Sequence, residues 1–322
     1  MDGNPTQIGD RPRVLLVVNT PGWAYANLAR ELIRVLADKF DFRIAVARQR
    51  PDLSVWAWDI VIVFGWAETY HQAFVADTRR VIKVVSSHRW TRAEGGDCAD
   101  AGAFARRFLN DAGTVVSLSR RLHAELLPYR PALFCPAGID TARFARKSPR
   151  DGTLRIGWAG NAADPCKGLH DILMPAAGDD FELQVAGGHF NHEQMIDFYQ
   201  GLDVICVAST AEGEPRTLLE GMASGCFVLT TDVGIVPELV HHRENGLIVR
   251  RTTAAFRAGF QWCRMNTDLI RQRGMENART MAATRDGTQV AGYWETAIRH
   301  AIALAGSNYP KPTPPVEVPD VG

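Results

Sequence analysis

The sequence lacks the features that would place the protein in a membrane, in the secretory pathway or on nucleic acid. No apolar run approaches the roughly 20 residues that a membrane-spanning helix needs. The first 13 residues contain no apolar core of a secretory signal. Acidic and basic residues number 36 each, so no overall field attracts a polyanion. These absences predict a cytoplasmic protein without a transmembrane segment, and nucleic acid is not indicated.

Paired cysteines and a dinucleotide fingerprint are missing as well. The six cysteines are scattered without a C-x-x-C pair, which predicts reduced, mostly buried thiols and no zinc site. Neither half of the chain has G-x-G-x-x-G after its first apolar run, which disfavours a Rossmann dehydrogenase. Apolar residues make up 46% of the 322, enough for real cores, and this length predicts two domains.

The sequence does contain a repeated alternation of short apolar runs and amphipathic segments. Runs such as Arg13–Asn19, Asp59–Phe64 and Val81–Val85 are rich in β-branched residues, as buried strands of a parallel sheet are. The intervening segments predict helices, among them 69–78 and 168–177. This alternation predicts the α/β class, with parallel sheets covered on both faces.

The stretch 208–225 organises the second half of this pattern. It lies between two apolar runs, and Pro215 falls in the first turn of a predicted helix. The free N–H groups and positive dipole of such a helix start suit a phosphate. Glu212 precedes the helix, and Glu220 shares a helix face with Arg216. Carboxylates beside a phosphate site suit sugar hydroxyls, so the pattern predicts a ligand that is part diphosphate and part polyol.

Residues 212–220 read E-G-E-P-R-T-L-L-E, which resembles the two-glutamate signature of family 4 glycosyltransferases. The G-M-A-S-G that follows, V-P-E-L-V at 236–240 and E-N-G-L-I-V at 244–249 also resemble that family. Order and spacing agree over about residues 155–250. The alternative is an ordinary amphipathic helix with an Arg216–Glu220 surface pair, which the other matching segments outweigh.

The resemblance implies a GT-B architecture, in which two Rossmann-like domains face each other across a cleft and the last helix crosses back to the first domain. We therefore expect an N-terminal, acceptor-side domain at 1–148, joined by a returning helix at 286–306. A nucleotide-sugar-binding domain is expected at 149–285, and a proline-rich tail at 307–322. The ligand would lie between the domains at the carboxyl ends of the strands.

The resemblance also implies the residues that bind the donor. Gly160-Asn161 and Lys167-Gly168 resemble the family's G-R-x-x-x-x-K-G loop, in which Arg and Lys grip the diphosphate. Lys167 matches, unless it is a solvated surface lysine. Asn161 replaces the Arg, so either Arg216 supplies the missing cation or the diphosphate is held more weakly. The expected donor-binding residues are Gly22, Gly160, Asn161, Lys167, Gly213, Glu214, Pro215, Arg216, Thr217, Leu218 and Glu220.

Three residues are expected to take part in catalysis, namely Glu212, His88 and Lys167. Glu212 would contact the donor sugar, and Glu220 would bond the ribose hydroxyls. His88 ends a predicted strand, where the family often has a histidine near the donor sugar. A strand-end histidine bonded to a backbone carbonyl explains it equally well. Gly22 lies in the first turn, where the family approaches the donor, but a simple tight turn is an equal alternative.

The resemblance implies an enzyme that transfers a hexosyl unit from a nucleotide-sugar, expected to be a UDP-sugar, with retention of configuration. The acceptor is open: a small molecule, a glycan, a lipid-linked molecule or a polymer. No D-x-D triplet occurs, which argues against the metal-dependent GT-A design, so neither a metal nor a cofactor is expected. The alternatives are a sugar-nucleotide epimerase on the same fold and a non-catalytic nucleotide-sugar-binding protein.

Overall fold

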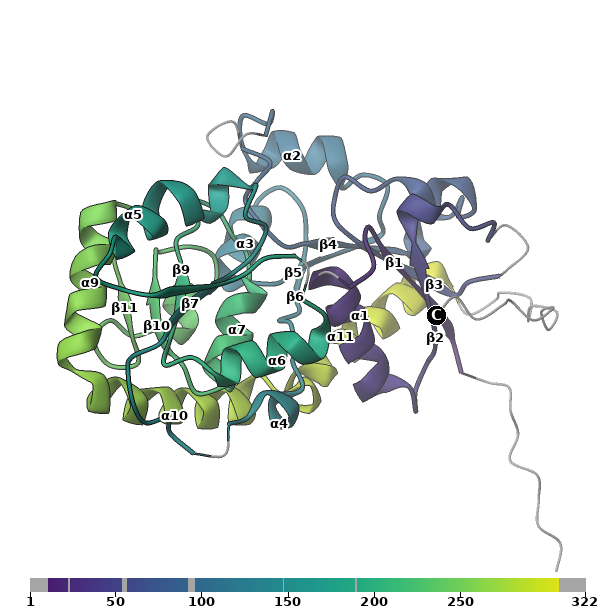
Figure 1. The fold of residues 1–322 in the computed structure, drawn as a ribbon. Coiled ribbons are helices and arrows are strands. Elements are labelled where there is room, and N and C mark those ends of the chain that lie inside the picture. Colours follow the sequence, from purple (N-terminus) through teal and green to yellow (C-terminus); the bar gives the residue numbers. More distant parts are fainter. Residues whose placement is uncertain are drawn as a thin grey trace, which may run out of the picture.

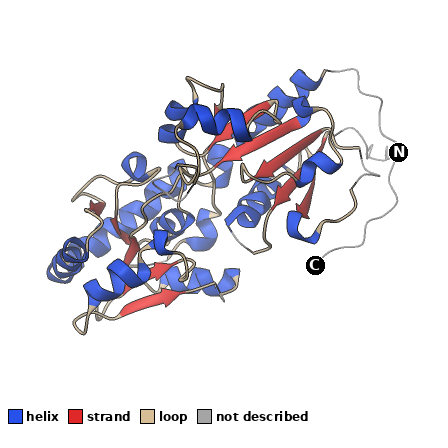
Figure 2. Cartoon of the chain, turned by 90° about the horizontal axis from the view of Figure 1, so that it is seen from above, coloured by secondary structure: helices blue, strands red, loops and turns tan. Residues whose placement is uncertain are grey.

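Two parallel β-sheets organise the chain (Figure 1). The computed structural model describes residues 11–22, 24–53, 57–91, 96–146, 148–188 and 190–306. Seen from above, the strands form two separate groups with helices around them (Figure 2). The expected α/β class with GT-B architecture is confirmed. The predicted proline-rich tail at 307–322 lies outside the described residues.

The first sheet has six strands in the order β2-β1-β3-β4-β5-β6. They are β1 (Arg13–Val18), β2 (Asp41–Val46), β3 (Ile60–Phe64), β4 (Val81–Val85), β5 (Thr114–Ser117) and β6 (Leu133–Phe134). β3 and β4 are buried along their whole length, as their unbroken apolar runs predict. Strand order reverses where β1 lies between β2 and β3, a point where α/β sheets bind ligands.

The helices of the first half are α1 (Ala24–Leu36), α2 (Ala101–Phe108), α3 (Arg120–Leu126) and α4 (Thr141–Phe144). The predicted helix over 69–78 is wrong. Two short 3-10 helices replace it, η2 (Tyr70–Ala73) and η3 (Thr78–Arg80). The Asp77 carboxylate accepts the Arg79 N–H, a local side-chain bond that competes with continued helix.

The second sheet has five strands in the order β11-β10-β9-β7-β8. They are β7 (Ile156–Ala159), β8 (Leu183–Ala186), β9 (Val204–Val207), β10 (Phe227–Thr230) and β11 (Gly246–Ile248). Order reverses at β7, which pairs with both β8 and β9. The loops that follow β7 and β9 therefore meet at one edge of the sheet, which is the ligand position expected of such a fold.

The helices of the second half are α5 (Met174–Ala177), α6 (His192–Gln200), α7 (Arg216–Ala223), α8 (Val236–Leu239), α9 (Thr253–Met265), α10 (Thr267–Thr284) and α11 (Gly287–Ala305). The helix predicted over 168–177 is only partly regular, since a π-helix, η6 (Leu169–Leu173), precedes α5. Pro175 explains this, because it has no N–H to donate to the carbonyl four residues earlier.

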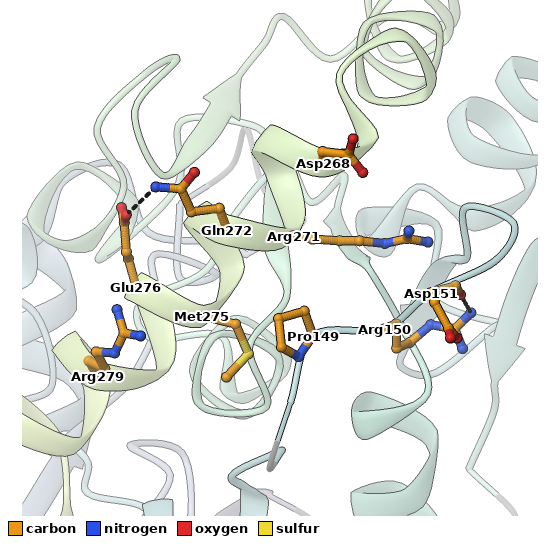
Figure 3. Close-up of a pocket in the computed structure, with 9 residues that line it drawn as sticks. All are labelled: Pro149, Arg150, Asp151, Asp268, Arg271, Gln272, Met275, Glu276 and Arg279. Atoms are coloured by element: carbon orange, nitrogen blue, oxygen red, sulfur yellow. Dashed lines mark hydrogen bonds between the residues drawn. The ribbon is translucent and has the colours of Figure 1, made fainter.

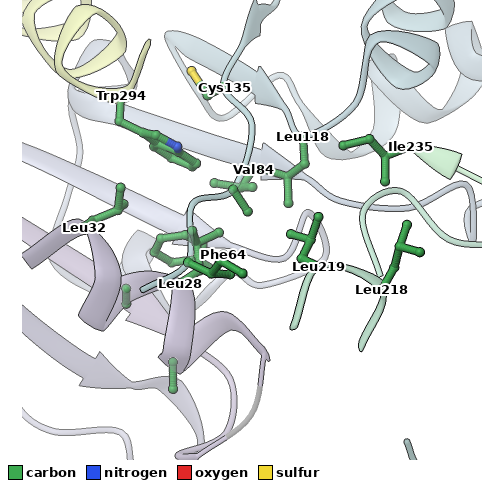
Figure 4. Close-up of a cluster of buried hydrophobic side chains, with 14 of the residues drawn as sticks. Leu28, Leu32, Phe64, Val84, Leu118, Cys135, Leu218, Leu219, Ile235 and Trp294 are labelled. Atoms are coloured by element: carbon green, nitrogen blue, oxygen red, sulfur yellow. The ribbon is translucent and has the colours of Figure 1, made fainter. Parts of the chain in front are cut away.

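The last helix returns to the first half, as expected of GT-B proteins. α11 packs against α1, and the indole N–H of Trp294 donates to the Pro136 carbonyl at 2.9 Å. Leu218 and Leu219 of α7 also belong to the buried cluster around Phe64 of β3 (Figure 4). The two halves thus share apolar core. Within the described residues, no helix is long and apolar enough to cross a membrane.

Trp294→Ala should lower the free energy of unfolding by about 3–5 kcal/mol, since it removes a fully buried indole and leaves a cavity. The neighbouring Tyr293 is 45% exposed on the same helix, so Tyr293→Ala is a matched control that should cost far less. Urea denaturation of both variants measures the difference. Equal losses would mean that α11 does not hold the first half as described.

Candidate functional site

The loop at residues 160–168 is fixed between the ends of β7 and β9. The indole N–H of Trp158 donates to the Lys167 carbonyl at 3.3 Å. Gly168 closes the loop with a φ of +72°, and a Cβ there would come within 2.4 Å of the Ala208 carbonyl oxygen. Only glycine fits both the backbone conformation and the close approach. The position of Lys167 is therefore set by the sheet beneath it.

Lys167 and Glu212, which are 45 positions apart in sequence, meet at this edge of the sheet. The Lys167 ammonium donates to the Glu212 carboxylate. The hydroxyl of Ser209 donates to the same carboxylate oxygen at 2.8 Å. Lys167 is thus not a solvated surface lysine, since its side chain is only 25% exposed. An anionic ligand here would have to compete with Glu212 for the ammonium.

The first half of the chain contacts the loop that carries Glu212. His88, which follows β4, places Nδ1 3.2 Å from the Glu212 carbonyl oxygen and Nε2 3.2 Å from the Glu125 carboxylate. A Cβ on Gly213 would lie 2.0 Å from the Ser86 carbonyl oxygen, so this glycine is required by the contact between the halves. His88 thus bonds a backbone carbonyl, as the alternative explanation for it expected. That carbonyl is the one of Glu212, so the contact also places His88 beside the predicted site.

The predicted shared face of Arg216 and Glu220 is confirmed. Arg216 Nε lies 3.1 Å from Glu220 Oε1, and Nη1 donates to the Gly138 carbonyl at 3.4 Å. Both side chains are largely buried, at 11% and 8% exposure, so this is no surface pair. Among the described residues, the contacts of Arg216 do not include Lys167. Its guanidinium is bonded to the Glu220 carboxylate and to the carbonyl of Gly138, where the chain leaves the first half.

α7 starts one residue later than expected. Pro215 is its N-cap instead of part of the first turn. The Leu218 N–H donates to the Pro215 carbonyl at 3.0 Å, and the Leu218 side chain is fully buried. Leu218 therefore anchors the helix start to the core. The backbone amides of Arg216 and Thr217 precede the first intrahelical bonds and are available to a ligand.

Three other predicted donor residues shape the backbone around these groups. Gly160 donates its N–H to the Ala186 carbonyl at 3.1 Å, which extends the pairing of β7 with β8. The side-chain oxygen of Asn161 accepts the Ala163 N–H at 3.1 Å and so forms a local turn. Gly22 has a φ of +74° in open space, so its own turn, and no contact within the protein, requires glycine.

Glu214 does something that the sequence did not indicate. Its carboxylate accepts the Ala137 N–H at 2.7 Å and pairs with Arg285 Nη1 at 3.1 Å. Ala137 lies where the chain leaves the first half, and Arg285 lies where it returns. Burial raises the pKa of Glu214 to about 8, although the Arg285 charge and the Ala137 N–H act in the opposite direction. Only the backbone amide of Glu214 is left for a ligand.

A cavity of about 670 Å³ lies away from all these residues (Figure 3). Residues 149–151 line one side of it, and side chains of α10 from Asp268 to Arg279 line the other. It contains none of the predicted site residues. Within the described part of the chain, no cluster of three or more His, Cys, Asp or Glu side chains could hold a metal ion.

A protein-family model matches part of the second half. Residues 183–279 match the model of the glycosyl transferases group 1. This part of the chain is therefore similar in sequence to that family. The matched region runs from β8 into α10 and includes Glu212, Glu220 and the amide-bearing start of α7, whereas Lys167 precedes it. Among curated proteins, none matches this sequence.

Solved structures agree in fold. HepE from Anabaena, in complex with UDP and glucose, superposes with a TM-score of 0.67 at 13% identity, over 90% of this chain and 100% of its own. Sucrose-phosphate synthase from Thermosynechococcus elongatus gives 0.69 at 14% identity, over 91% and 100%. A glycosyltransferase from Rickettsia africae gives 0.62 at 13% identity, over 93% and 100%. At these identities the likeness establishes the GT-B fold and nothing more.

Glu214→Gln should change how stability depends on pH. The folded-state pKa of about 8 lies above the ordinary value of 4.5, so the folded protein holds a proton that the unfolded chain has lost. The extra proton stabilises the folded protein fully below about pH 4.5, and this contribution to the free energy of unfolding disappears as the pH rises through about 8. The Tm of the wild type should therefore fall relative to that of the variant between these values. A difference in Tm that stays constant over this range contradicts the raised pKa.

Proposed function

We propose that this glycosyltransferase moves a hexosyl unit from a UDP-sugar to an acceptor with retention of configuration. The observation that carries the proposal is the meeting of Lys167 and Glu212 at the β7–β9 edge, opposite His88. One cation, one carboxylate and the free amides of α7 suit a ligand that joins a diphosphate to a sugar.

The family and the fold support the same ligand class. HepE has been solved with UDP-glucose, and the pneumococcal O-GlcNAc transferase GtfA, which shares this fold at 15% identity, with UDP and GlcNAc. In the proposed reaction, the bond between the sugar C1 and the diphosphate oxygen breaks. The acceptor oxygen forms the new bond to C1 on the same face, and its proton passes to the departing diphosphate.

The predicted residues that meet at this edge have the following roles in the proposal. Lys167 balances the charge that grows on the leaving diphosphate. Glu212, freed from Lys167, accepts hydrogen bonds from the sugar hydroxyls. His88 holds the Glu212 backbone and faces the sugar from the first half. Glu220, oriented by Arg216, accepts the ribose hydroxyls. The backbone N–H groups of Gly213, Glu214, Arg216 and Thr217 bond the phosphates, whereas Pro215 has none to donate.

Lys167→Ala should reduce transfer by about tenfold to hundredfold, the effect of losing one charge-assisted hydrogen bond. The loss should fall on kcat more than on KM, because charge on the leaving group grows in the transition state. Arg251→Ala is the matched control, since Arg251 braces the same loop through the Pro165 carbonyl at 2.9 Å. Equal losses in both variants would indicate loop disorder, and wild-type rates for Lys167→Ala would refute its role.

Glu220→Gln should weaken UDP binding but leave 2′-deoxy-UDP binding nearly unchanged, because the carboxylate is proposed to bond the ribose hydroxyls. Isothermal titration of wild type and variant with both ligands gives four dissociation constants. Together they form a thermodynamic cycle that isolates the contact between Glu220 and the 2′-hydroxyl. The wild type should prefer UDP, and the variant should lose about tenfold of that preference. A variant that keeps the full preference rules out this contact, and a wild type that binds UDP without transferring sugar would be a non-catalytic binder.

A further inference from the structure

Within the described residues, the second half offers no uncommitted cation beside Lys167. Arg251 braces the same loop, but its guanidinium donates to the Pro165 and Ala208 carbonyls and pairs with Asp171. Asn161 stands where the family loop has Arg, and its side-chain oxygen is used in the turn to Ala163. Arg216, the substitute that the sequence suggested, pairs with Glu220. A lysine alone binds a diphosphate as a single point charge. The first half therefore has to be searched for the missing partner.

Arg89 reaches this loop from the first half. It follows His88 at the carboxyl end of β4, and its Nη2 donates to Asp164 Oδ2 at 2.8 Å. Asp164 lies three positions before Lys167 in the loop between β7 and the π-helix. The Arg89 side chain is 33% exposed and Asp164 is 20% exposed, so a ligand can reach the pair. No other contact of Arg89 within the described residues holds its guanidinium.

The electrostatics tie Arg89 and Lys167 to the same two carboxylates. Asp164 and Glu212 both act on the Arg89 guanidinium, and Asp164 also experiences the charge of Lys167. Partial burial alone would raise the pKa of Asp164, but the hydrogen bond and charge of Arg89 outweigh it and lower the pKa. Asp164 pairs with Arg89, and Glu212 pairs with Lys167, so each cation of this group has one carboxylate partner.

We propose that Arg89 is the second diphosphate-binding cation of this enzyme, supplied across the cleft in place of the arginine that Asn161 replaces. The inference rests on the proposed function. Asp164 holds the guanidinium in this structure, and the donor phosphates would take its place. A planar guanidinium binds phosphate oxygens in pairs. Since Arg89 lies on the first half, donor binding then also joins the two halves.

The competing explanation is that Arg89 and Asp164 only latch the halves together. A matched pair exists for this comparison. Arg121 Nη2 lies 2.6 Å from Asp232 Oδ1, again between the first and second halves, and neither residue belongs to the proposed site. Arg121→Ala therefore removes a cross-half ion pair without touching the diphosphate position.

The test is isothermal titration of UDP and UMP against wild type, Arg89→Ala, Arg89→Lys, Asp164→Asn and Arg121→Ala. GDP and ADP with their monophosphates are titrated in parallel. Arg89→Ala should lose about tenfold to hundredfold in UDP affinity and little in UMP affinity, with Arg89→Lys intermediate. Asp164→Asn should keep or tighten UDP binding, because it frees Arg89 and still accepts the Cys166 N–H. Arg121→Ala should bind UDP as the wild type does.

Rescue provides a second, independent readout. Adding Asn161→Arg to Arg89→Ala should restore most of the lost UDP affinity, which a purely structural role of Arg89 would not allow. Equal losses of UDP binding in Arg89→Ala and Asp164→Asn would overturn the proposal in favour of the latch. The proposal is also overturned if the wild type prefers UDP over UMP and the Arg89→Ala variant keeps that preference. A wild type that prefers no diphosphate refutes the proposed function itself and this inference with it.

Discussion

The buried pair of Glu214 and Arg285 is the interaction on which the arrangement of the two halves depends. One carboxylate bonds the segment that leaves the first half, through Ala137, and the segment that returns to it, through Arg285. The same residue lies between Gly213 and Pro215, so the loop that faces the cleft is fixed to both crossing points of the chain. Breaking one partner would leave a buried charge uncompensated, which is costly. The proposed donor loop is therefore as rigid as the connection between the sheets.

Much of the fold could be predicted because buried parallel strands have an unmistakable pattern. β4 matches its predicted range of Val81–Val85, and β3 begins one residue late. The failures occur where local chemistry overrides helical periodicity, as at Asp77, which bonds the Arg79 amide, and at Pro175, which cannot donate. The domain limits, 1–148 with 286–306 and 149–285, stay a prediction, since the shared apolar core offers no boundary of its own.

The candidate site was predictable where a motif or a strand end marks it, as for Lys167, Glu212 and His88. Lys167 and Glu212 belong to motifs whose spacing resembles the family, and the pairing of β7 with β9 brings the two together. Their roles remain predictions. Arg89 was missed, and so was the cross-linking role of the Glu214 side chain, because their partners, Asp164 and Arg285, lie 75 and 71 positions away in sequence. No periodicity or motif signals a contact of that kind, which depends on how the two halves face each other.

The charge balance among the side chains of the proposed site has a consequence for which molecules it admits. Arg89, Lys167, Asp164 and Glu212 carry two charges of each sign, so their sum is zero. An inorganic phosphate ion would gain two cations only by stranding two carboxylates, which repel it. A molecule that also brings hydroxyl donors satisfies those carboxylates while its phosphates occupy the cations. The glutamate and aspartate would then act as a filter that keeps abundant small anions from occupying the cleft.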